Sequence, residues 1–257
     1  MRICSYYVGL EDDYDTGLNF IGKYDQHDIR LAFFKNDEQG GLDGYVSSRN
    51  ERYSYDVIGI RNFENGEGIW DAPDQGMAES NTFNLRYAYN FTNTEVGVSL
   101  QSGDLEGVNG SLGAQTAYAF HVKSNIDNIG IMFQYSDYEY DLDNGFDSVV
   151  VGAWAFNDTI PTEAKLYNLN LSYNKSVSFG PITNLTFYND YNLMTDKSGD
   201  FKEDTVMNVT GVAITAGGVY AYVDFITAKN QPFIGGTMAG DSDEWNKRLN
   251  INIGYYF

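Results

Sequence analysis

The sequence predicts an all-β fold: an antiparallel transmembrane β-barrel of about 14 strands, within a range of about 12–16. The last thirteen residues, Trp245 to Phe257, alternate apolar side chains such as Leu249, Ile251 and Ile253 with mostly polar ones. A period of two indicates a strand with two different faces. A barrel ends on a strand because its last strand pairs with its first. No run reaches the roughly 18 apolar residues of a membrane helix, so any spanning is by strands.

The first third of the chain has weaker strand patterns. Arg2–Leu10 is the first predicted strand, and the acidic stretch EDDYD interrupts it. Alternation resumes over 17–24 and 29–33, followed by a Gly- and Asp-rich loop with a weak strand around Tyr45. Residues 52–62 form a further predicted strand, in which a change of parity between Val57 and Ile58 indicates a bulge. A long loop over 62–80 follows.

Strand patterns sharpen from Phe83 onward. Residues 83–91 and 95–101 alternate around the short link TNT, which predicts a hairpin. The further predicted strands are 112–122, 129–135, 148–156, 165–174, 185–193, 206–215, 219–227 and the terminal strand. Short turns alternate with long polar loops, as in outer-membrane barrels, except at the short links near Thr92 and Ser124. The segment Asp141–Ala164 is therefore either a through-strand or a loop folded into the lumen.

Aromatic and charged residues decide between a soluble and a membrane protein. The chain has 21 Tyr and 16 Phe, and they gather at the ends of predicted strands, as the interface girdles of a membrane barrel do. The polar face is rich in Asn, Ser and Gly, whereas a soluble β-sandwich, the alternative, carries more Lys and Glu there. A net charge of −20 argues against binding nucleic acid. Cys4 is the only cysteine, so an internal disulfide and a zinc cluster are excluded.

The organisation predicted is one outer-membrane barrel domain over 1–257 in a Gram-negative bacterium. The start, MRICSYYVGL, has one basic residue and no apolar stretch, so it is not a signal peptide. We therefore expect an N-terminally truncated product whose export signal is absent from this chain. The sequence carries no motif for a metal or a cofactor, and we expect neither.

The last hundred residues resemble a known family. AFNDTIPTEAKLYNLNLSYNKSVSFGPITNLTFYNDYNLM, TGVAITAGGVYAYVDFITAKNQPFIGG and WNKRLNINIGYYF, within Ala155–Phe257, are similar to the C-terminal part of Gram-negative porins of the phosphate-selective porin O and P type. The resemblance implies a water-filled barrel, a homotrimer and passive uptake of small hydrophilic solutes. It also implies contact with outer-membrane lipid and lipopolysaccharide. Phe257, with Tyr255 and Ile253 before it, looks like the signal read by the barrel-assembly machinery.

Six ionisable residues are the predicted lining of the pore, because their parity puts them on the polar face. They are Arg86, Glu95, Lys123, Asp190, Asp224 and Arg248. Too few of them are basic for the phosphate specificity of the porin O and P type to be carried over. Because acidic loops outnumber basic ones, the sequence predicts a weak cation preference that fades as salt rises.

The predicted function is a porin-like outer-membrane channel for passive diffusion of small hydrophilic solutes. The alternative is a non-conducting barrel, or a fragment of one, with a structural, adhesive or ligand-binding role. Catalysis is not expected. His121 and Ser124 lie three apart on one predicted strand, so they point to opposite faces and cannot pair as base and nucleophile.

Overall fold

The computed structural model describes residues 15–37, 55–153 and 155–256. The predicted strand Arg2–Leu10, the weak strand around Tyr45, most of EDDYD and Phe257 lie outside the described residues. Eleven strands form one antiparallel sheet, called the wall here. Four strands form a second sheet, which together with the connection 61–74 is called the plug here. The predicted all-β antiparallel fold is confirmed.

The strands of the wall follow one another in chain order, apart from the four strands of the plug. The wall consists of β1 (Thr16–Tyr24), β2 (His27–Asn36), β5 (Ala78–Asn90), β6 (Thr94–Gly107), β7 (Gly110–Ile126), β8 (Ile129–Leu142), β11 (Glu163–Phe179), β12 (Ile182–Thr195), β13 (Thr205–Ala216), β14 (Val219–Lys229) and β15 (Trp245–Tyr255). The plug contains β3 (Asp56–Ile60), β4 (Gln75–Gly76), β9 (Ser148–Ala153), β10 (Phe156–Pro161) and the single-turn 3-10 helix η2 (Phe63–Asn65). In the described part of the chain, no helix combines the length and apolarity that a membrane span needs.

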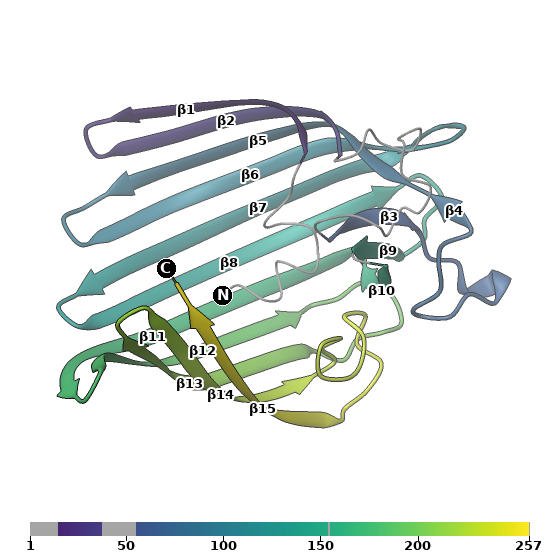
Figure 1. Ribbon diagram of the computed structural model, residues 1–257. Helices are drawn as coiled ribbons and strands as arrows, with labels where there is room; N and C mark the ends of the chain where they lie inside the picture. The colour runs from purple at the N-terminus through teal and green to yellow at the C-terminus, as the bar shows by residue number, and fades with distance from the viewer. Residues whose placement is uncertain (1–14, 38–54, 154, 257) are drawn as a thin grey trace.

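Tight turns join the wall strands at one end of the sheet, seen for β1–β2, β5–β6 and β7–β8 in Figure 1. Asp25 and Asp127 begin two-residue turns with φ of 48° and 51°, and Gly217 begins another with φ of 60°. Positive φ at these positions gives the turn the twist of the flanking strands. The connections at the other end are longer, apart from 108–109 between β6 and β7.

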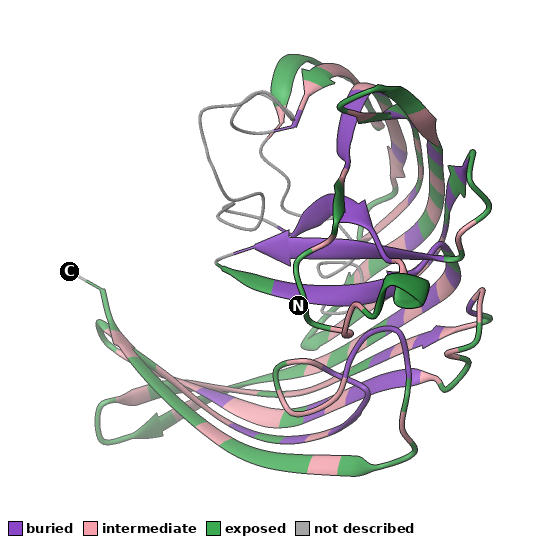
Figure 2. Ribbon diagram, turned by 90° about the vertical axis from the view of Figure 1, so that its right-hand side faces the viewer, coloured by how far each residue is buried: buried purple, intermediate pink, exposed green. Residues whose placement is uncertain are grey.

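The wall curves into an arc rather than a flat sheet, and the plug lies in its concavity (Figure 2). In the sheet formed by the described residues, β1 and β15 are the two edges. β8 pairs directly with β11, and β9 and β10 between them belong to the plug. Residues 141–164 therefore include an insertion into the concavity, and the turns near Thr92 and Ser124 fall at the same end of the wall.

The two faces of the wall differ in chemistry. The convex face carries exposed apolar and aromatic side chains from every region of the sheet. Those predicted to point outward share this face: Phe83, Leu85, Leu169, Leu171, Leu249, Ile251 and Ile253. Ile253 is 72% exposed and Ile251 is 62% exposed, which is unusual for isoleucine. Polar side chains alternate with these residues and face the plug or the concavity.

The plug is buried on both faces of its sheet. Every residue of β3 and of β9 is buried, so the run Val149–Val151 is apolar without alternation. The expected bulge is confirmed, because the register of β3 against β9 shifts between Val57 and Gly59.

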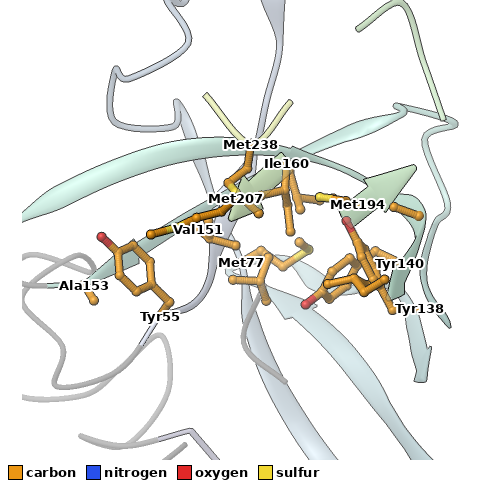
Figure 3. Packing of buried hydrophobic residues seen from close by; sticks show 14 of the residues in the cluster. Tyr55, Met77, Tyr138, Tyr140, Val151, Ala153, Ile160, Met194, Met207 and Met238 are labelled. Atoms are coloured by element: carbon orange, nitrogen blue, oxygen red, sulfur yellow. The ribbon is translucent and has the colours of Figure 1, made fainter. Parts of the chain in front are cut away.

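A cluster of buried side chains joins the plug to the wall. Figure 3 shows Val151 and Ile160 of the plug close to Met194 and Met207 of the wall and to Met238 of the β14–β15 connection. Each of these five side chains is at most 5% exposed. Burial of apolar surface contributes about 25 cal/mol per Å², so this cluster stabilises the attachment of the plug to the wall.

Arg61 is a buried cation at the end of β3. Its Nη1 lies 2.7 Å from Glu67 Oε2, and its Nε donates to Thr159 Oγ1 at 3.1 Å. Its Nη2 donates to the carbonyl oxygens of Ile69 and Asp71. One guanidinium thus holds the connection after β3 against β10.

Replacing Arg61 by Met should loosen the plug. Removing one partner of a buried ion pair typically costs about 3–5 kcal/mol, because the other charge is left without compensation. The measurement is hydrogen exchange of plug amides such as that of Val150. Lys165→Met is the matched control: Lys165 pairs with Asp196 at 2.8 Å, but both side chains are exposed, so no change in plug exchange is expected. Equal exchange in both variants would contradict the role of Arg61.

Candidate functional site: an ionic cluster on the concave face

Three of the six predicted pore-lining residues meet on the concave face. Arg86 comes from β5, Glu95 from β6 and Lys123 from β7. Glu95 lies opposite Lys123, and Arg86 lies opposite Ser99 on the neighbouring strand. Since alternate residues of a strand share a face, this register brings the three charges to the same region of the wall.

Glu95 is the centre of this group. Its Oε1 lies 2.6 Å from Arg86 Nη2 and 3.0 Å from His121 Nε2. Arg86 Nη2 and His121 Nε2 are themselves 3.4 Å apart. The carboxylate therefore contacts a guanidinium and an imidazole from two different strands.

The first hairpin adds three charges that sequence reasoning missed. Asp28 is buried and lies 3.2 Å from Arg30 Nε, 3.6 Å from Arg86 Nη1 and 3.6 Å from Lys23 Nζ. The signal was present, because Asp28 and Arg30 alternate with apolar residues on β2. Lys23, Asp28, Arg30, Arg86, Glu95, His121 and Lys123 are called the ionic cluster here.

Small residues make room for the cluster. Gly97 lies opposite both Ala88 and His121, in the middle of the charged region. A Cβ at Gly97 would lie 2.4 Å from Cε1 of the His121 ring, which is too close for any side chain. The imidazole therefore occupies the space that a larger residue on β6 would take.

A hollow of about 320 Å³ adjoins the cluster along the same strands. Its lining combines Arg30 and Arg86, amide and hydroxyl side chains that include Asn19, Asn84, Gln101 and Ser136, and apolar residues such as Phe34 and Leu100. Guanidinium, amide and hydroxyl groups can replace part of the hydration shell of a small polar solute. The side chains that line the hollow can therefore bind a small charged solute and screen its charge.

The other three predicted residues lie elsewhere on the concave face. Asp190 accepts a hydrogen bond from Asn170 Nδ2 at 2.7 Å. Asp224 accepts from Tyr188 and, at 3.0 Å, from Asn250 Nδ2. Arg248 is exposed on β15, opposite Ile226. The structure therefore separates a mainly basic region on β1–β7 from an acidic one on β12–β14.

Several further residues singled out by the sequence have defined positions. Ser124 Oγ lies 2.8 Å from Thr94 Oγ1, whereas His121 contacts Glu95, so the two do not form a pair. Lys165 lies on the convex side, opposite Asp137. Ile253 and Tyr255 are exposed on the convex face of β15. Within the residues that the structure describes, no group of three or more His, Cys, Asp or Glu could hold a metal ion.

Comparison with known proteins identifies no family for this chain. No family model matches the chain, and neither does any curated protein. Among solved structures, the match to LpxR from Salmonella typhimurium covers 98% of this chain and 90% of the LpxR chain, at 10% sequence identity and a TM-score of 0.32.

One expectation is corrected by this comparison. The sequence predicts no catalysis, and the match to LpxR stands against that expectation. The expectation is withdrawn. At this TM-score the match assigns neither a reaction nor a catalytic residue to the chain.

Asp28→Asn should destabilise the first hairpin of the wall. It removes a carboxylate that lies within 3.6 Å of three cations, and a hydrogen bond to a charged group contributes about 1.5–3 kcal/mol. The measurement is urea unfolding of the protein refolded in detergent. Asp25→Asn is the matched control, since Asp25 is exposed in the adjoining turn and Asn also tolerates its positive φ. A similar loss in both variants would contradict the importance of the cluster.

Proposed function

We propose that this chain is an outer-membrane barrel whose concave face lines a restricted, porin-like path for small hydrophilic solutes. The observation that carries the proposal is the division of the wall into two surfaces. The convex face exposes apolar and aromatic side chains, and the concave face holds the ionic cluster and the carboxylates of β12 and β14. A membrane barrel that surrounds water needs this division.

The bilayer is the medium that suits the convex face. Leu171 is the central residue of β11, and Leu169, Leu171 and Tyr173 are exposed along the convex face of this strand. Aromatic residues such as Phe179 and Tyr255 stand near strand ends, where membrane interfaces favour them. Lipid offers no hydrogen bonds to the backbone groups of a strand at a sheet edge. The edges β1 and β15 must therefore be paired when the protein is in a membrane.

The plug restricts this path. Its buried cluster fills part of the concavity, so solutes would pass along the polar surface that it leaves open. The concave charges of both signs are comparable in number, so they give mild selectivity; the excess negative charge of the chain adds a weak cation preference at low salt.

A non-conducting barrel that binds a ligand is the second candidate. The buried, apolar attachment of the plug favours this candidate, since a plug that never moves would leave no continuous channel. In that case the hollow beside the ionic cluster would be the binding site.

Planar-bilayer recordings on the refolded protein distinguish the two candidates. A conducting barrel should give discrete steps, with a reversal potential that indicates weak cation preference at low KCl and declines at high KCl. Stable insertion without conductance would favour the ligand-binding barrel. Arg61→Met, which loosens the plug, should increase the step size of a conducting barrel.

Leu171→Arg should impair folding into lipid vesicles. Arginine on the lipid face near the bilayer midplane costs about 2–4 kcal/mol. Ser172→Arg is the matched control, because Ser172 is the next residue of β11 and lies on the concave face. Folding yield and urea unfolding in vesicles give the comparison. If both variants fold like the wild type, the membrane assignment fails.

A further inference from the structure

The long connection between β14 and β15 is fastened to the plug at its middle. Residues 237–239 of this connection are buried, and the Met238 side chain lies in the central cluster. Figure 3 shows Met238 beside Met207 of the wall and Ile160 of the plug. Two buried charged groups hold the backbone at this point.

The first is the Asp158 carboxylate of β10. One oxygen accepts from the Met238 amide at 2.8 Å. The other accepts from Thr237 Oγ1 at 2.5 Å and from the Thr159 amide at 2.8 Å. Asp158 is 1% exposed, so these donors replace the water that the carboxylate loses.

The second is the Lys197 ammonium of the β12–β13 connection. It donates to the carbonyl oxygens of Met238 at 2.8 Å and of Ala239 at 3.3 Å. It also donates to Thr205 Oγ1 and to the carbonyl of Glu203. The backbone of Met238 is thus held through its N–H by a carboxylate and through its C=O by an ammonium.

Few other charges act on Asp158. Lys197 is the charged group that lowers its pKa, β9 presents Val151 opposite it, and 237–238 present a hydroxyl and an amide. At the rim of the connection, Lys229 Nζ of β14 lies 2.6 Å from Asp243 and 3.0 Å from Glu203, while Asp241 and Glu244 are exposed. Asp158 is therefore the buried acid at this contact.

We propose that Asp158 and Lys197 form a pH-sensitive latch that fastens the β14–β15 connection to the plug, tightest in mild acid and weakest at neutral and higher pH. The latch is defined by its contacts with the backbone of Met238. It does not depend on whether the barrel conducts. Where the porin-like function holds as well, the latch regulates how far the mouth of the path is open.

Titration of Asp158 determines whether the latch tightens or loosens as the pH rises. Burial raises the pKa of Asp158 from 3.8 to about 7, although its hydrogen bonds and Lys197 act to lower it. In the undocked connection the carboxyl meets water and regains its ordinary pKa. The docked form therefore binds the proton more tightly, so docking is strongest below the ordinary pKa and weakens as pH rises toward 7. Above that pH both forms are ionised and the dependence levels off.

Hydrogen exchange of the Met238 amide tests the latch in the full chain refolded in detergent, because this amide is the donor to Asp158. Its protection factor, corrected for intrinsic exchange, should rise by about twentyfold between pH 7.5 and 5.5 and stay flat above pH 8. Asp158→Asn should abolish this dependence. Lys197→Gln should move it to higher pH, because the cation that lowers the pKa of Asp158 is gone.

Two controls make the outcome specific. Asp241→Asn changes an exposed carboxylate of the same connection and should keep the wild-type dependence. The protection factor of the Val212 amide of β13 should show no such dependence on pH. A flat wild-type profile, or a dependence that persists in Asp158→Asn, would overturn the latch. A latch that titrates as expected in a protein without conductance would instead show that the proposed channel function, and not the latch, is wrong.

Discussion

Alternation of side chains along each strand is the constraint on which the structure depends. A strand offers its odd and even residues to opposite faces, so one sequence must suit two environments at once. On β11, Leu169 and Leu171 face outward while Asn168 and Asn170 face the concavity. Antiparallel pairing satisfies the backbone between the two surfaces, and the side chains are then free to differ. The ionic cluster and the apolar outer surface both follow from this arrangement.

The plug obeys a different rule because the wall surrounds it. Its strands are buried on both faces, so Val149, Val150 and Val151 are all apolar. A segment packed in this way has little exposed surface on which to place its charges. Two of its buried charges, at Arg61 and Asp158, are matched with buried partners and backbone groups. Charge thus joins segments of the plug that apolar contact alone would leave free to slide.

Local patterns explain why much of the wall could be predicted from the sequence. The hairpin of β5 and β6 and the terminal strand were predicted because alternation and short turns are properties of neighbouring residues. The same alternation predicted that Arg86, Glu95 and Lys123 lie on the polar face of their strands. Asp28 and Arg30 could have been found in the same way, whereas the contact of Asp158 with Met238 could not. The contact of Asp158 with Met238 joins segments far apart in the chain, and no local sequence pattern predicts it.

The plug strands also have a consequence for the order of events during folding. Most hairpins of the wall close a loop of two or three residues, which costs little entropy. β3 and β9 pair only when Asp56 meets Gly152, after most of the wall between them has been synthesised. Contacts between such distant residues form slowly. The wall hairpins with short turns are therefore expected to form before β3 pairs with β9.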